Sequence, residues 1–168
     1  MVMFSIQAKA DEYHHQLKET KLFGYFHDYS SGGPNATDFP VVGLPGRLWR
    51  YDQFGTLYVF DDPLTEGPEP TSPKLGRFQA TTVTVSLDGQ NVHTSGSVVF
   101  TNEAYNGSTI QILGVTNQFN FIGEYAVTSG TGKFRYASGF VTTETLFFDP
   151  TPSISYVLLR LNVTIRHY

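Results

Sequence analysis

The chain is built from short segments of β-type sequence, and none of them shows the period of a helix. Val, Thr, Phe and Tyr dominate these segments, and turn dipeptides such as Asp88-Gly89 and Asn106-Gly107 separate them. About eight such segments follow one another at hairpin spacing. A meander of this kind loses its exposed edges most simply by closing on itself. The sequence therefore predicts an all-β fold, an antiparallel and roughly eight-stranded β-barrel.

The stretch 54–80 shows how the segments are punctuated. Its first half is rich in aromatic and β-branched residues, which favours a strand. Proline lacks the backbone donor that a central strand needs, so we expect this strand to end at Asp62-Pro63. The Pro- and Gly-rich run 66–70 excludes a helix. The next strand is expected to begin near Leu75.

Composition excludes several classes of partner and site. The 168 residues are enough for one domain with a full core, and 14 Phe and 10 Tyr beside 2 Met suit a sheet protein. A net charge of −4 makes nucleic acid an unexpected partner. The chain has no cysteine, and its 5 histidines lack the spacing of metal ligands. We therefore expect neither a metal nor another cofactor.

The N-terminal residues 1–21 are polar and mixed in charge, so we expect an arm there and a barrel domain over 22–168, with a first long strand at Leu22–Tyr29. The first residues lack the basic and apolar regions of a secretion signal. No apolar run approaches the roughly 20 residues of a membrane helix. The expectation is a cytoplasmic protein without a membrane partner.

Several short motifs follow one another along the chain: H-D at 27–28, F-D-D-P at 60–63, G-R-F-Q at 76–79, G-T-G at 130–132 and a closing S-Y-V-L-L-R-L-N-V-T-I at 155–165. Together they resemble the plant dirigent family over roughly residues 23–165. The set is specific, although no single motif would be. The resemblance implies an eight-stranded antiparallel barrel whose interior holds side chains or one small ligand.

The resemblance also implies a catalytic interpretation, which this sequence supports only in part. Asp28 matches an acidic pocket residue of dirigent proteins, an acid that could protonate a quinone-methide-like intermediate. The family's second acid falls on Thr116, its arginine on Gly123, and its aromatic pair on Thr82 and Thr84. A lone carboxylate has no partner to tune it. We therefore predict that the chain is not an enzyme and has no catalytic residue.

The replacing residues suggest carbohydrate binding, since small hydrogen-bonding side chains bind hydroxyls and aromatic rings stack on sugar faces. The long connection 30–52 carries the only tryptophan, and loops of that length are often functional. The alternative is that the threonines simply fill β-positions and the tryptophan pins the loop. The predicted binding residues are Asp28, Trp49, Tyr51, Thr82, Thr84, Thr116 and Asn117.

Two neighbouring features favour a structural role. An aspartate before proline often caps a turn, so we expect Asp61-Asp62 to do so and Arg77 on the next strand to pair with an aspartate. His27 and Asp28 are adjacent on a strand, so their side chains should point to opposite faces and form no dyad.

Within the family, the chain is similar to the dirigent-like module that precedes a jacalin-related lectin domain in grass chimeric jacalins. This predicts a non-catalytic module of a plant defence or stress lectin that binds an oligosaccharide, with a C-terminal jacalin-type lectin domain as a partner and a homo-oligomer as one possible state. One alternative is a dirigent auxiliary that steers stereoselective phenoxy-radical coupling. Another is a structural oligomerisation domain for the attached lectin.

Overall fold

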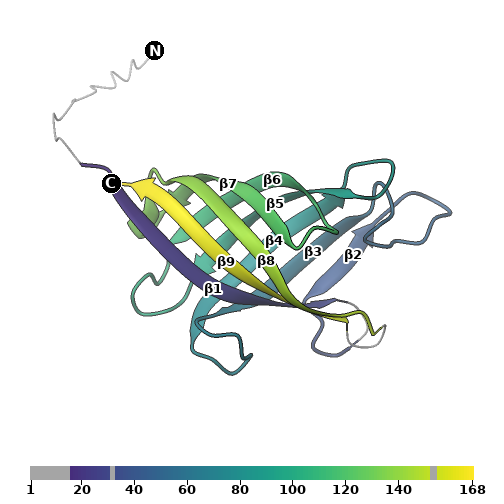
Figure 1. Cartoon of the computed structure of the whole chain (residues 1–168), viewed down its shortest axis with the longest axis horizontal. Coiled ribbons are helices and arrows are strands. Elements are labelled where there is room, and N and C mark those ends of the chain that lie inside the picture. The colour runs from purple at the N-terminus through teal and green to yellow at the C-terminus, as the bar shows by residue number, and fades with distance from the viewer. Residues whose placement is uncertain (1–15, 31–32, 152–154) are drawn as a thin grey trace, which may run out of the picture.

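The computed structural model describes residues 16–30, 33–151 and 155–168, and they form a closed β-barrel (Figure 1). The strands are β1 (Lys18–Ser30), β2 (Asp38–Val42), β3 (Leu57–Thr65), β4 (Lys74–Thr84), β5 (Asn91–Phe100), β6 (Thr109–Asn117), β7 (Ile122–Thr131), β8 (Ser138–Asp149) and β9 (Ser155–His167). A single turn of 3-10 helix, η1 (Gly132–Phe134), lies between β7 and β8. The predicted all-β barrel is confirmed, with nine strands where about eight were expected. The described part of the chain contains no helix long and apolar enough to cross a membrane.

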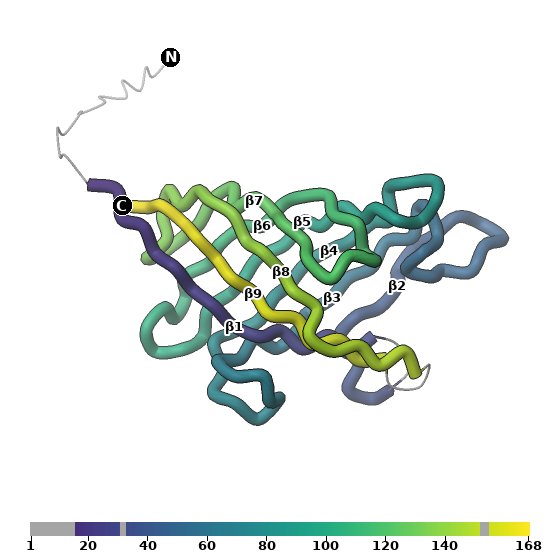
Figure 2. Tube along the Cα trace, in the orientation of Figure 1, coloured from purple at the N-terminus to yellow at the C-terminus, as the bar shows by residue number. Residues whose placement is uncertain are grey.

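The barrel closes through its first and last strands. β1 pairs with β9 in antiparallel register from Lys18–His167 to Ser30–Ser155. Figure 2 shows these two strands side by side, the first in purple and the last in yellow. Successive strands from β2 to β9 are paired in antiparallel hairpins, as the turn residues predicted.

The strand that the sequence did not predict is β2. It is short, and Pro40 in its middle is a residue that normally argues against a strand. It pairs with β3 on one side and meets β1 only at the pair Ser30–Asp38. β2 therefore fills a seam between β1 and β3 near one end of the barrel.

The predicted end of a strand at Asp62-Pro63 is wrong, because β3 continues to Thr65. β3 pairs with β2 up to Phe60 and with β1 only from Leu64 onward. Pro63 lies between these two pairings and has a ladder partner only on β4. The missing N–H therefore faces a local gap in the sheet and costs no ladder hydrogen bond.

The boundary predicted between arm and domain also shifts. β1 begins at Lys18 rather than at Leu22, because its pairing with β9 extends to His167. Residues 1–15 of the predicted arm lie outside the described residues. β4 begins at Lys74, next to the predicted start near Leu75, and continues to Thr84.

The apolar core fills one end of the barrel. Phe100, Tyr105 and Phe134 pack with ring centroids 5.0–5.5 Å apart there, and Ile110 and Ile165 are fully buried. We call this end the base; both described chain ends lie on this side (Figure 1). We call the opposite end the mouth: there β1, β4, β6 and β8 end, and the loops before β3, β5 and β7 extend outward.

Candidate functional site

The mouth brings together the residues that the sequence singled out from distant segments. Asp28 lies near the end of β1 and faces the interior, two residues beyond the core residue Phe26. On the neighbouring strands β4, β5 and β6, Thr84 is paired with Val92 and Val92 with Thr116, so these three residues lie side by side on one face. Thr82 lies two residues from Thr84 and faces the same interior.

Asp28 has acidic neighbours that the sequence did not predict. Asp38 on β2 is opposite Phe60, and Asp62 on β3 lies two residues beyond Phe60 on the same interior face. Asp62 is only 1% exposed, and its carboxylate accepts a hydrogen bond from Thr37 Oγ1. Asp28 accepts a hydrogen bond of 2.9 Å from Ser30 Oγ. We call Asp28, Asp38 and Asp62 the acid cluster.

Burial makes the ionised forms of the acid cluster unfavourable. It raises the pKa of Asp28 well above its ordinary value, although the hydrogen bond from Ser30 opposes the rise. Burial and then the negative charge of Asp28 raise the pKa of Asp38 and of Asp62 further still. Three carboxyl groups whose charges act on one another cannot all ionise at neutral pH. Asp38 and Asp62 therefore favour their protonated forms more strongly than Asp28 does.

One oxygen of the cluster has no donor among the described residues. Asp38 Oδ1 is buried, yet nothing within the described ranges hydrogen-bonds to it. A buried acceptor without a partner is costly unless the group is neutral or a ligand supplies the donor. The premise that Asp28 is a lone carboxylate is therefore wrong: its partners come from β2 and β3 rather than from the position of Thr116. Across the described chain, no group of His, Asp and Glu is arranged to hold a metal.

The threonines face the interior, but their hydroxyls already have protein partners. Thr82 Oγ1 lies 3.2 Å from Thr94 Oγ1, and Thr84 Oγ1 donates to the carbonyl of Tyr51 at 2.6 Å. Thr116 Oγ1 lies 2.9 Å from the hydroxyl of Tyr125. These contacts match the alternative in which the threonines are structural.

Two phenols inside the mouth were missed by sequence reasoning, which had followed only the aromatic positions of the family. Tyr58 on β3 faces the interior, and burial followed by the charge of Asp38 raises its pKa to about 12. Tyr125 on β7 also faces the interior, beside Thr116. Each tyrosine lies two residues from an interior side chain, Tyr58 from Phe60 and Tyr125 from Val127. Strand alternation therefore could have placed both phenols inside the barrel.

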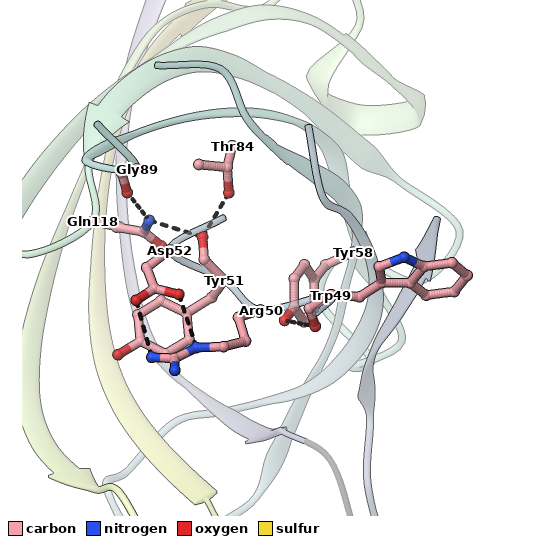
Figure 3. Close-up of polar contacts among 8 residues, drawn as sticks. All are labelled: Trp49, Arg50, Tyr51, Asp52, Tyr58, Thr84, Gly89 and Gln118. Atoms are coloured by element: carbon pink, nitrogen blue, oxygen red, sulfur yellow. Dashed lines mark hydrogen bonds and ion pairs between the residues drawn. The ribbon is translucent and has the colours of Figure 1, made fainter. Parts of the chain in front are cut away.

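The loop before β3 is tied to the mouth by its backbone, as Figure 3 shows. Gln118 Nε2 donates to the carbonyls of Tyr51 and Gly89, at 2.9 and 2.6 Å. The Tyr58 hydroxyl donates to the carbonyl of Trp49 at 3.1 Å. The Trp49 indole points away from these contacts and lies against Gly43, where a Cβ would come within 2.4 Å of its ring.

The remaining predicted residues lie around the rim. Tyr51 is 49% exposed and its ring contacts Phe119, with centroids 6.3 Å apart. Asn117 Nδ2 donates to Gln90 Oε1 at 3.1 Å, on the face opposite to that of its neighbour Thr116. The structure thus gathers Asp28 and the three threonines inside the mouth and leaves Trp49, Tyr51 and Asn117 outside it.

The structural interpretation of the two neighbouring motifs is confirmed in part. Arg77 Nε forms an ion pair with Asp61, but Asp62 lies inside the barrel rather than capping a turn. His27 and Asp28 do point to opposite faces. The His27 ring is hydrogen-bonded at 2.8 Å to both Tyr156 and Thr65, whereas Asp28 faces the interior. They form no dyad.

Comparison with known proteins identifies the chain's family. The family model described as dirigent-like protein matches residues 19–166. The chain belongs to the dirigent family. A similar relative is dirigent protein 15 of Arabidopsis thaliana, 35% identical over 90% of this chain and 81% of the relative. Pterocarpan synthase 1 of Glycine max is 31% identical over 89% of this dirigent chain and 79% of the relative.

The fold agrees with a solved dirigent structure. The pterocarpan synthase dirigent protein GePTS1 superposes with a TM-score of 0.85 at 28% identity, covering 97% of this chain and 99% of that chain. The names of these relatives refer to dirigent proteins and a pterocarpan synthase, which favours the dirigent alternative over the predicted lectin function. The carbohydrate ligand and the chimeric jacalin setting stay predictions.

Proposed function

We propose that this dirigent protein binds a small phenolic intermediate in the barrel mouth and directs its ring closure or coupling by proton transfer from Asp28. The observation that carries the proposal is the acid cluster: Asp28, Asp38 and Asp62 come from three neighbouring strands at the mouth, where burial raises the pKa of each carboxyl group. Val157 on β9 is the ladder partner of Asp28, and Phe148 on β8 is the ladder partner of Val157, so both lie on the same face of the sheet as Asp28. This differs from the non-catalytic function expected from the sequence.

The chemistry suits a quinone methide, which is neutral, planar and electrophilic. The carboxyl group of Asp28, when protonated, donates its hydrogen to the quinone-methide oxygen, which becomes a phenol hydroxyl. A phenolic O–H of the same or a second molecule attacks the methide carbon and forms the new C–O bond. The proton released by that oxygen returns to the carboxylate, so the acid is regenerated and atoms balance without a cofactor.

The barrel controls the stereochemical outcome by exposing one face of the planar intermediate. A barrel of about eight strands has an interior that can hold one small ligand, and the core at the base limits how deeply it enters. Asp28 is the strongest acid of the three, because burial raises its pKa to about 6, whereas burial and the charge of Asp28 raise the pKa of Asp38 to about 8 and that of Asp62 to about 9.

Two substrates distinguish coupling of two molecules from ring closure within one. One reaction supplies coniferyl alcohol with a one-electron oxidant; the other supplies a racemic 2-hydroxybenzyl alcohol that carries a second phenol and yields a quinone methide by loss of water. Chiral chromatography measures the enantiomeric ratio of each product. We expect enrichment in at least one reaction, lost in Asp28→Asn and kept in Asp88→Asn, whose carboxylate lies in an exposed hairpin turn. Racemic product in both reactions would refute the proposal.

A further inference from the structure

Tyr125 is a phenol inside the mouth that the proton transfer from Asp28 does not use. Its side chain packs against the edge of the core from β7, and its hydroxyl lies 2.9 Å from Thr116 Oγ1 on β6. Two hydroxyls that share one hydrogen bond keep one hydrogen to donate and unused lone pairs to accept. The pair is therefore an uncharged site that can bond one oxygen of a ligand.

Two glycines make the room that the Tyr125 ring occupies. A Cβ at Gly114 would lie 3.1 Å from Tyr125 Cδ1, and one at Gly123 would lie 3.5 Å from Cε2 and 2.9 Å from Thr143 Oγ1. A side chain at either position would press on the ring or on its neighbours. The ring and the glycines thus form one local arrangement, in which Gly123 is the position where the family resemblance places an arginine.

A row of small side chains connects Tyr125 to the acid side of the mouth. Gly114 is paired with Thr94, Thr94 with Thr82, and Thr82 with Tyr58 on β3. The charge of Asp38 contributes to the raised pKa of Tyr58, so this phenol lies on the acid side. The two phenols therefore stand at opposite ends of a row whose middle residues do not project far into the interior.

We propose that Tyr125, held by Thr116, is the second anchor of the phenolic ligand and bonds an uncharged oxygen remote from the one that Asp28 protonates. This rests on the proposed function and specifies its substrate class, a neutral phenol with a second oxygen. The pair carries no positive charge, whereas an arginine at position 123 would. A ligand that carries a carboxylate would meet the negative acid cluster without compensation, so the mouth selects against it.

The test compares binding of two stable probes, coniferyl alcohol and ferulate, which differ by a carboxylate in place of a hydroxymethyl group. Affinities are measured by titration calorimetry for the wild type, Tyr125→Phe, Thr116→Val and the control Tyr136→Phe, whose ring is exposed near the base. We expect wild type to bind coniferyl alcohol more tightly than ferulate. Each mouth variant should lose about three- to tenfold affinity for coniferyl alcohol, the effect of one neutral hydrogen bond. The control should not change.

Product analysis separates positioning from acid catalysis. With the quinone methide formed from the 2-hydroxybenzyl alcohol, Tyr125→Phe should keep the rate of ring closure near that of the wild type while the enantiomeric ratio moves toward racemic, whereas Asp28→Asn should lose the rate enhancement itself. Unchanged affinity in both mouth variants would contradict the proposal that Tyr125 is a second anchor. Ferulate bound as tightly as coniferyl alcohol would contradict it too, as would a wild type that binds neither probe. Racemic product from a wild type that shows the expected affinities would count against the proposed function and leave the anchor standing.

Discussion

Replacing Asp28 by asparagine should make the protein more stable at alkaline pH while removing its acid. The pKa of Asp28 is raised by burial from 3.8 to about 6, so the folded state holds this proton more tightly than the unfolded state does. The contribution of Asp28 to stability is then most favourable in acid, where the group is protonated in both states, and it falls as pH rises from 3.8 through about 6. A shift of about two pKa units corresponds to about 3 kcal/mol. At pH values above about 6, the ionised Asp28 therefore lowers the free energy of unfolding by about this amount.

Asparagine keeps an oxygen that can accept the hydrogen bond from Ser30 and cannot ionise. Urea unfolding at about pH 4 and about pH 8 should therefore show the variant close to wild type in acid and up to about 3 kcal/mol more stable in base. Asp88→Asn is the matched control. Hydrogen bonds from Ser86 and Gln90 lower the pKa of Asp88, so its loss should change stability at pH 8 in the opposite direction.

The test of a raised Asp28 pKa is how the difference in free energy of unfolding between wild type and Asp28→Asn changes with pH. If the free energies of unfolding of wild type and Asp28→Asn differ by the same amount at both pH values, the carboxyl group of Asp28 is not held against its ionisation. The acid cluster would then lose its role as a proton donor. A variant less stable than wild type at about pH 8 would refute the reasoning in the same way.

Three further substitutions, together with one control, test packing and surface charge by urea unfolding. Ile110→Ala opens a cavity in the fully buried core and should cost about 2–5 kcal/mol, whereas Leu113→Ala on the same strand, 39% exposed, should cost much less. Gly96→Ala places a Cβ about 2.2 Å from that of Ala80 and should cost about 1–3 kcal/mol. Arg77→Ala removes an ion pair that is 41% and 50% exposed and should cost less than about 1 kcal/mol.

The regular part of the fold was predictable because period and turn chemistry are local. Gly89 and Gly107 take φ values of +77 and +76, as the predicted tight turns require, and strand alternation correctly separated His27 from Asp28. Asp62 escaped prediction because its place before proline suggested a turn cap. Alternation from the aromatic Phe60 would have placed it inside the barrel.

The candidate site was predictable only where it depended on one strand at a time. Comparing matching positions showed which groups this chain lacks at Thr116 and Gly123, but a missing side chain says nothing about what fills its space. Tyr125 occupies that space from two residues away, and the second acid comes from a different strand altogether. Both depend on pairing between strands, which no single segment encodes.

The irregularity of the barrel and its acid cluster have the same origin. β1 and β3 pair directly only at Tyr25 and Phe26, so toward the mouth the sheet opens and β2 enters the gap. That strand brings Asp38 to the side of Asp28, and the same gap lets Pro63 follow Asp62 within β3 without breaking a ladder. A regular pairing of β1 with β3 would have left no strand to carry Asp38. The departure from regular pairing is thus what brings Asp38 beside Asp28 and Asp62 in the mouth.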